Sequence, residues 1–154
     1  MSKSLPSSWL IIIAQFVWTT MWRIMMSQLA PSNESGDYNR PKSQFLNYID
    51  TEKDNPYSPE KGRYRLYVGL SCPWAHRTLI VRALKELEDV IEVCIVYPSP
   101  VKGGWIMKET SEGCDSLRQL YLLAQSGYKG RYTVPVLWDQ KTKTCPIHVI
   151  DRCH

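Results

Sequence analysis

The stretch LYVGLSCPWAHRTLIVRALKEL, residues 66–87, decides the fold of this chain. Apolar residues alternate over residues 63–70, which is typical of a strand, and the alternation ends at a glycine. A Cys-Pro pair follows, and proline suits the first turn of a helix that we expect over residues 73–89. The stretch therefore predicts a strand, a turn that carries Cys72, and a helix. The apolar residues expected on the buried side of that helix are Ile80, Leu84 and Leu87.

The residues downstream continue the alternation of strands and helices. Residues 90–97 form a nearly continuous apolar run, which is typical of a buried parallel strand. Prolines and glycines over residues 98–115 predict an irregular segment. Residues 116–125 have helical spacing, and residues 132–138 predict a strand that Pro135 interrupts. The order β-α-β-α-β predicts an α/β domain that begins with a parallel β-α-β unit.

Composition places limits on function and compartment. The 154 residues suffice for one domain of ordinary size. The net charge of +4 comes from 19 basic and 15 acidic residues spread along the chain, so we predict no nucleic-acid partner. Five cysteines without framework-like spacing favour a reducing compartment, and we expect a cytoplasmic protein.

An apolar segment at residues 9–30 raises the question of membrane contact. Its charge-free part is shorter than the ~20 apolar residues of a membrane span, and polar residues interrupt it. We favour a packed or exposed helix, with membrane contact as the alternative. The expected organisation is a hydrophobic helix (1–30), an extended arm or linker (31–62), an α/β domain (63–144) and a divergent tail (145–154).

The chemistry of the chain centres on Cys72. The N-terminus of a helix favours an anion, so the predicted position stabilises a thiolate. Ala75 stands where a Cys-x-x-Cys motif has its second sulfur, so Cys72 has no partner for a local disulfide. A single thiolate of this kind attacks an external sulfur and stays as a mixed disulfide until another thiol resolves it. A buried, inert cysteine is the alternative interpretation.

Pro135 is unusual inside a strand because it has no backbone N–H to donate. A cis peptide at the strand end would solve the problem and leave the backbone of Val134 free to pair with an extended peptide. A simple edge-strand proline is the alternative.

Three other groups of residues have less specific interpretations. We expect Cys94 to be an inert thiol in a buried strand and Cys114 to be exposed in a loop. Trp105, in a glycine-rich segment, covers either loop backbone or a ligand. The tail contains four potential zinc ligands at spacings tighter than ordinary finger motifs, so we predict no metal site. These are Cys145, His148, Cys153 and His154.

Several motifs together resemble one family, the xi-class glutathione transferases, which are the glutathionyl-hydroquinone reductases. The motifs are TTMWRIMMSQLAP (19–31), SGDYNRP (35–41), the stretch 66–87, GGW (103–105) and LRQLYLLAQSGYKGRYTVPVLWD (117–139). The resemblance implies a thioredoxin-like N-terminal domain, which this family follows with an all-helical domain. It also implies glutathione as co-substrate, glutathionylated quinol-type molecules as partners, and no metal.

The resemblance assigns roles to individual residues. Cys72 resembles the family's nucleophile, and Trp105 is similar to the indole that covers glutathione. The residues that resemble the run holding the tripeptide beside the cis-proline are Arg131, Tyr132, Thr133 and Val134. Enzymes of this family use glutathione to strip a glutathionyl group from hydroquinones, leaving free hydroquinone and oxidised glutathione.

The chain departs from the family after residue 144. Val149 and Ile150 stand where the family has a Glu-Ser pair at a helix N-terminus, and the sequence has no helical domain. We therefore expect a prematurely ended copy that lacks the family's dimer interface and turns over substrate poorly. The alternative is a non-catalytic thioredoxin-like fragment or thiol-binding module.

Overall fold

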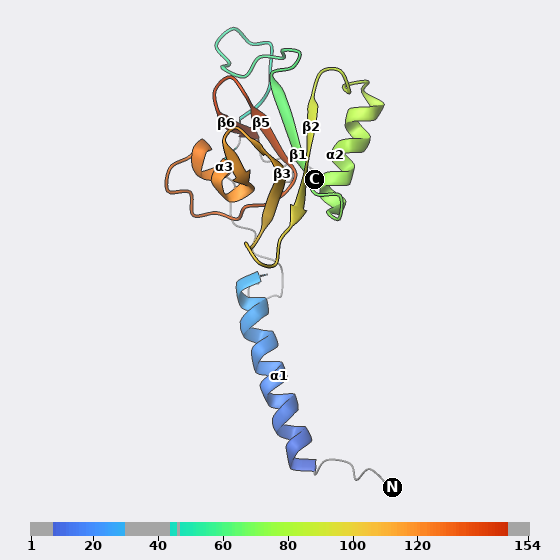
Figure 1. Ribbon diagram of the computed structural model, residues 1–154, viewed down its shortest axis with the longest axis vertical. Helices are drawn as coiled ribbons and strands as arrows, with labels where there is room; N and C mark the ends of the chain where they lie inside the picture. Colours follow the sequence, from blue (N-terminus) through green and yellow to red (C-terminus); the bar gives the residue numbers. More distant parts are fainter. Residues whose placement is uncertain (1–7, 30–43, 46, 148–154) are drawn as a thin grey trace. The chain divides into compact units, whose positions relative to one another are not determined.

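The computed structural model describes residues 8–29, 44–45 and 47–147, which fall into two compact units, Met1–Lys42 and Ser43–His154. In the first unit, α1 (Ser8–Leu29) is one uninterrupted helix, drawn in blue in Figure 1. No helix within the described ranges is long and apolar enough to cross a membrane.

The second unit is built on one six-stranded sheet (Figure 1). Its strands are β1 (Tyr64–Val68), β2 (Glu92–Pro98), β3 (Trp105–Ser111), β4 (Cys114–Ser116), β5 (Val136–Asp139) and β6 (Thr144–Ile147), in the order β4-β3-β2-β1-β5-β6. β1 and β2 are parallel, and the other neighbours are antiparallel. The predicted β-α-β start is confirmed, with helix α2 (Pro73–Leu84) as its crossover. β6 runs across the domain boundary that we expected at residue 144.

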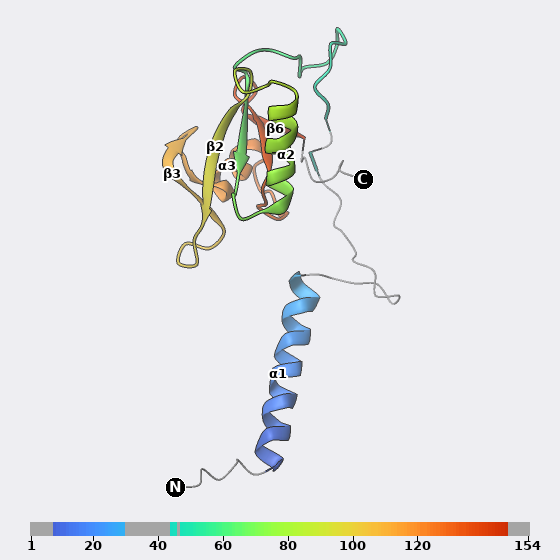
Figure 2. The same ribbon diagram turned by 90° about the vertical axis from the view of Figure 1, so that its right-hand side faces the viewer.

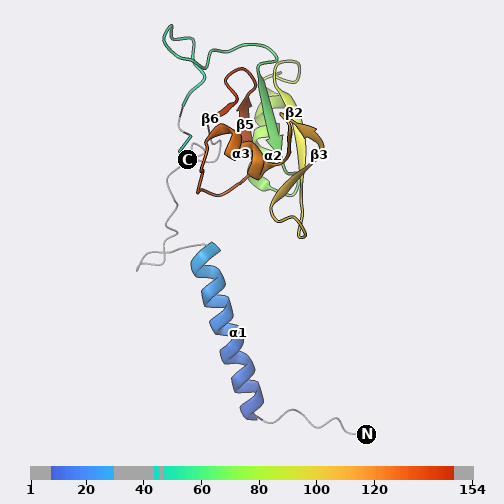
Figure 3. The same ribbon diagram turned by 60° about the vertical axis from the view of Figure 1, so that its left-hand side comes forward.

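Two helices cover opposite faces of the sheet, α2 on one side and α3 (Leu117–Ala124) on the other (Figure 2). Alternate residues of β1 point to the two faces, as a pleated strand requires. The α2 face packs Leu66 and Val68 against Ala75. The α3 face holds the larger core, where Tyr67 packs with Leu117 and other buried side chains. Figure 3 shows α3 in front of the sheet on this second face.

The prediction of an irregular segment over residues 98–115 is wrong. It contains β3, which pairs with β2 from Val96↔Met107 to Pro98↔Trp105, and β4, which pairs with β3. The sequence concealed this hairpin because only the first three residues of β3 are apolar. The last four residues of β3 are polar, and glycines and prolines flank the strand.

Helix α2 ends earlier than predicted and buries a different side. It stops at Leu84, where Glu86 adopts the left-handed region (φ 52°) and the Leu87 N–H donates to the Arg82 carbonyl, 2.9 Å away. Ile80 and Leu84, expected inside, are 46% and 77% exposed. The side that faces the sheet consists of Ala75 and Leu79. Apolar residues line both sides of this helix, so spacing alone selected the wrong one.

A buried ion pair at the sheet also binds the described part of the arm. The Arg63 guanidinium donates two hydrogen bonds to the Asp139 carboxylate, at 2.9 and 2.6 Å. The same guanidinium donates to the Pro56 carbonyl and to the Ser58 hydroxyl. The Asn47 N–H adds a bond to the Pro146 carbonyl at 2.9 Å.

Candidate functional site

Cys72 lies at the turn between β1 and α2. Its backbone is extended, its N–H donates to the Gly69 carbonyl at 2.9 Å, and its own carbonyl accepts the His76 N–H at 3.1 Å. Cys72 is the N-cap residue of α2, and its half-buried thiol makes no capping hydrogen bond to the first turn of the helix. The thiol Sγ lies 3.7 Å from the Val134 carbonyl oxygen. The fold therefore brings Cys72 next to Val134, which is 62 residues further along the chain.

The predicted cis peptide between Val134 and Pro135 is confirmed. The strand that we expected from Tyr132 is shorter, because β5 begins at Val136, which pairs with Tyr67. The backbone of Val134 thus lies outside the sheet register, next to the Cys72 thiol, while its side chain is buried in the core.

Trp105 reaches the same turn from β3. A Cβ atom at Gly69 would lie 2.3 Å from the Trp105 ring, so the ring rests directly on the backbone three residues before Cys72. Gly69 is therefore required by this close approach, which the sequence analysis missed. The indole is half-buried, and Cys72 packs on the same core cluster.

The run from Arg131 to Thr133 leads into this site, but its side chains have different surroundings. Arg131 is exposed. The Tyr132 ring packs into an aromatic cluster, 5.8 Å from the Tyr121 ring centroid. The Thr133 carbonyl accepts a hydrogen bond from the Tyr121 hydroxyl at 3.0 Å, and burial raises the pKa of Tyr121, so this hydroxyl stays protonated and donates. The helical spacing of residues 116–125 gave no sign of this hydrogen bond.

We expect Tyr121→Phe to lower the free energy of unfolding by about 1 kcal/mol, because the hydrogen bond from the Tyr121 hydroxyl to the Thr133 carbonyl is lost. Urea denaturation of the two proteins measures the difference. Tyr97→Phe is the matched control, since Tyr97 is 44% exposed and its change should be within about 0.5 kcal/mol. Equal effects at the two positions would contradict the anchoring role.

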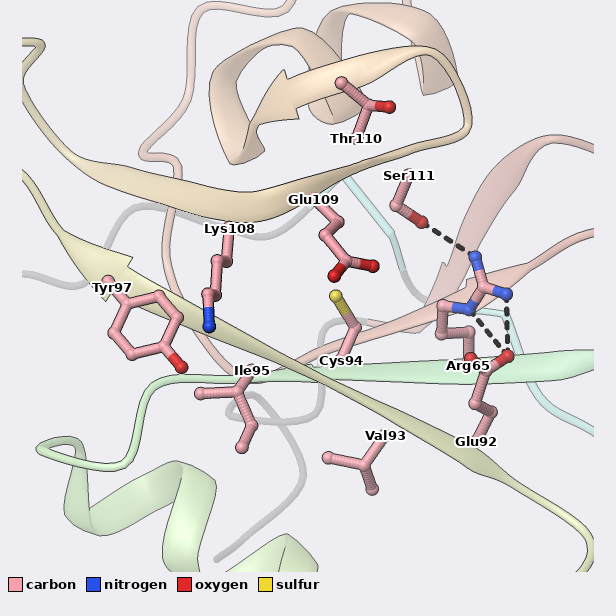
Figure 4. A pocket seen from close by; sticks show the side chains of 10 residues that line it. All are labelled: Arg65, Glu92, Val93, Cys94, Ile95, Tyr97, Lys108, Glu109, Thr110 and Ser111. Carbon is pink, nitrogen blue, oxygen red and sulfur yellow. Dashed lines mark hydrogen bonds and ion pairs between the residues drawn. The ribbon is translucent and has the colours of Figure 1, made fainter.

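A hollow of about 440 Å³ lies away from Cys72, where β2 and β3 diverge (Figure 4). Its polar groups largely satisfy one another, because the Arg65 guanidinium donates to Glu92 at 2.9 and 2.6 Å and to Ser111 at 2.7 Å. Figure 4 shows the Cys94 thiol beside the Glu109 carboxylate. The Arg65 guanidinium favours the Cys94 thiolate, but burial and the Glu92 and Glu109 carboxylates outweigh it, so the pKa of Cys94 is raised and the thiol is a poor nucleophile.

The other described cysteines lie in strands of the sheet. Burial and the nearby Glu92 and Glu109 carboxylates raise the pKa of Cys94, which is half-buried. Cys114 was expected to be exposed, and this is wrong: it lies in β4 and is 5% exposed. Burial and adjacent acidic groups also raise the pKa of Cys114. Cys145 is buried in β6.

Iodoacetamide at neutral pH should label Cys72 faster than Cys94 or Cys114. Burial and nearby carboxylates raise the pKa of Cys94 and of Cys114, which leaves less thiolate at pH 7, whereas Cys72 is half-buried at a helix N-terminus. Mass spectrometry of tryptic peptides after timed quenching gives each rate. The rate of each thiol in urea serves as its own control for intrinsic accessibility. Slower labelling of Cys72 than of Cys94 would overturn the assignment of the reactive thiol.

The structure groups no three potential metal ligands among the residues that it describes. Three of the four tail residues considered above, His148, Cys153 and His154, lie outside the described residues.

These features define a thioredoxin-like domain with a single cysteine where β1 meets α2. Residues 71–150 match the family described as Glutathione S-transferase, N-terminal domain. The chain therefore belongs to the glutathione transferases, and its relatives place it in the xi class.

Three relatives illustrate the similarity. The Escherichia coli protein glutathionyl-hydroquinone reductase YqjG is 42% identical over 123 residues, covering 71% of this chain and 38% of that protein. The xi glutathione transferase of Phanerochaete chrysosporium is 40% identical with a TM-score of 0.65, over 75% of this chain and 40% of that one. Xi glutathione transferase ECM4 of Saccharomyces cerevisiae, solved in complex with glutathione, is 32% identical and has a TM-score of 0.63. The match covers 73% of this chain and 43% of that one. The chain thus spans about two fifths of the length of the curated relatives it matches.

Proposed function

We propose that this chain is a glutathione-dependent thiol transferase that removes glutathione from glutathionyl-hydroquinones through a mixed disulfide at Cys72. The observation that carries the proposal is the meeting of the Cys72 thiol with the Val134 backbone at the start of α2. The names of its relatives, two of which are glutathionyl-hydroquinone reductases, support the substrate class.

The proposed reaction has two steps. In the first, the Cys72 thiolate attacks the sulfur of the glutathionyl-hydroquinone, so that a sulfur–sulfur bond forms and the carbon–sulfur bond breaks. The ring carbon takes up a proton, and free hydroquinone leaves. In the second, the thiolate of a free glutathione attacks the mixed disulfide, which releases oxidised glutathione and the Cys72 thiolate. Two glutathionyl sulfurs are oxidised to one disulfide while the carbon–sulfur bond is reduced to carbon–hydrogen.

The same geometry supports a binding mode for the tripeptide. Its backbone would pair with Val134, which stands outside the sheet register beside the thiol. The exposed guanidinium of Arg131 would hold a glutathione carboxylate, and the Trp105 indole would cover the bound peptide. Tyr132 packs into the core through its ring and Thr133 accepts from Tyr121, so these two residues would contribute through the shape of the backbone.

Turnover of a glutathionyl-hydroquinone with excess glutathione tests the proposal. Chromatography should show free hydroquinone and oxidised glutathione appearing in equal amounts, at a rate proportional to the concentration of the chain. A reaction without the chain is the control for spontaneous exchange. A chain that forms the Cys72–glutathione adduct but releases no hydroquinone would be a thiol-binding module, and the proposed turnover would be refuted.

A cytoplasmic location follows from this chemistry, because the second step consumes reduced glutathione. The described cysteines carry no disulfide, which agrees with such a compartment.

A further inference from the structure

We propose that Ser99 is a phosphorylation site for a proline-directed serine kinase, and that its phosphate weakens the binding of anionic thiol ligands at the Cys72 site. The sequence contains the substrate pattern of such kinases, Ser-Pro-x-Lys, twice, as SPEK at residues 58–61 and as SPVK at residues 99–102. In both copies the proline keeps the preceding serine extended, which is the backbone conformation in which a kinase binds its substrate. The sequence does not distinguish the two serines, but their surroundings in the structure do.

The Ser99 copy of the pattern lies in the loop between β2 and β3, which projects beyond the end of the sheet (Figure 1). Ser99 is half-buried, whereas Pro100 is exposed, Val101 is 94% exposed and the Lys102 side chain is 62% exposed. The Ser99 hydroxyl oxygen accepts a hydrogen bond from the Lys102 N–H at 3.1 Å, which is a bond between two neutral groups at the surface. A kinase therefore reaches this hydroxyl by loosening only the tip of a hairpin.

The Ser58 copy of the pattern is bound to the buried ion pair of the sheet. The Ser58 hydroxyl oxygen accepts from the Arg63 guanidinium at 3.0 Å, and the Ser58 carbonyl accepts from the Tyr64 hydroxyl at 2.8 Å. The same guanidinium donates to Asp139, which is 0% exposed. Breaking one hydrogen bond to a charged group reduces the accessible population by a factor of at least about ten. The structure therefore favours Ser99 over Ser58 as the acceptor of a phosphate.

The modification is a phosphoryl transfer from ATP. The Ser99 hydroxyl oxygen attacks the γ-phosphorus, so that a new phosphorus–oxygen bond forms, the bond to the bridging oxygen breaks, and ADP leaves. The hydroxyl proton passes to the catalytic carboxylate of the kinase. The resulting phosphate carries a charge of about −1.5 to −2 at pH 7.

The new charge would stand beside the part of the candidate site that Trp105 forms. The Ser99 N–H donates to the Gly104 carbonyl at 2.8 Å, and Trp105 is the next residue along the chain. The Trp105 ring rests on the backbone of Gly69, in the turn that leads to the reactive thiol.

Lys102 is the only cation in the loop, and its ammonium already contacts the Asp115 carboxylate at 3.2 Å, so it cannot fully neutralise a phosphate as well. Glutathione has two carboxylates and one ammonium, so like charges would repel. The effect on glutathione rests on the proposed function, whereas the position of the modification does not.

Phosphorylation of the full chain by a purified proline-directed serine kinase with ATP tests the assignment. Mass spectrometry of tryptic peptides should show Ser99 modified at least about tenfold faster than Ser58, because only Ser58 must first leave the Arg63 guanidinium. Ser99→Ala should lose most of the phosphate, and the matched control Ser58→Ala should keep it. Synthetic peptides that span the two patterns separate the preference of the kinase from the effect of the fold. Faster modification of Ser58 in the chain, or no modification of Ser99, would refute the assignment.

Alkylation of Cys72 tests the effect of the phosphate without glutathione. Iodoacetate is an anion and iodoacetamide is neutral, so the ratio of their rates reports the electrostatic potential at the thiol. In about 10 mM salt, phosphorylation should slow iodoacetate about twofold relative to iodoacetamide, and about 1 M sodium chloride should remove the difference. Ser99→Ala treated with the same kinase is the control.

An unchanged ratio of the two alkylation rates in the phosphorylated chain would refute the effect on the site. Failure of the unmodified chain to bind glutathione would contradict the proposed function alone, because the alkylation ratio does not depend on glutathione. The two proposals can therefore fail separately.

Discussion

Replacing Cys72 by serine should abolish the mixed disulfide with glutathione and lower hydroquinone release to the rate of the reaction without the chain. A hydroxyl in place of the thiol cannot form the sulfur–sulfur bond on which both proposed steps depend. Intact-mass spectrometry after incubation with oxidised glutathione detects the adduct as one added glutathionyl group, and chromatography measures the hydroquinone.

Cys94→Ser is the matched control for this experiment. Cys94 lies in β2 beside the hollow of Figure 4, and burial with two nearby carboxylates raises its pKa. Its serine variant should therefore keep the adduct and the rate of the parent chain. An adduct that persists in Cys72→Ser and disappears in Cys94→Ser would move the reactive site to β2.

Replacing Arg63 by alanine should lower the free energy of unfolding by about 3–5 kcal/mol, because it leaves the Asp139 carboxylate buried without its charged partner. The carboxylate is 0% exposed, and it loses two hydrogen bonds at 2.9 and 2.6 Å. Urea denaturation at pH 7 measures the change. Lys141→Ala, which removes an exposed ion pair with Glu60 at 3.2 Å, is the matched control and should cost at most about 1 kcal/mol.

The pH dependence of stability provides a second readout for the same pair. Burial opposes ionisation of Asp139, but hydrogen bonds from the Arg63 guanidinium, the Lys141 N–H and the Thr142 hydroxyl outweigh it and hold the pKa of this carboxyl below its usual value. The resulting stability is present above the unfolded-state pKa of about 3.9 and is lost as pH falls towards the folded-state pKa. Arg63→Ala should flatten this acid dependence, and an unchanged slope would show that the ion pair contributes little.

The candidate site was largely predictable as a set of residues but not as an arrangement. The position of Cys72 at a helix start followed from the Cys-Pro pair. The cis bond before Pro135 was one of two interpretations of a proline in a strand, and the structure selects it over an edge-strand proline. The support of this loop by Tyr121 and the close approach of Trp105 to Gly69 did not follow from local patterns. Each contact joins two segments that are separated in the sequence, and no local pattern indicates that they are neighbours in the fold.

By itself, the sequence determined the local elements of this protein: the strand before Gly69, the helix from Pro73, and the parallel β-α-β unit that they begin. These depend on side-chain periodicity and on the backbone limits of proline and glycine, which act within a few residues. Only the tertiary structure decided that residues 105–116 form a hairpin, that Cys114 is buried, and that α2 presents Ala75 rather than Leu84 to the sheet. Burial is a property of contacts between distant segments, and a helix or strand with apolar residues on both sides does not specify which side those contacts will cover.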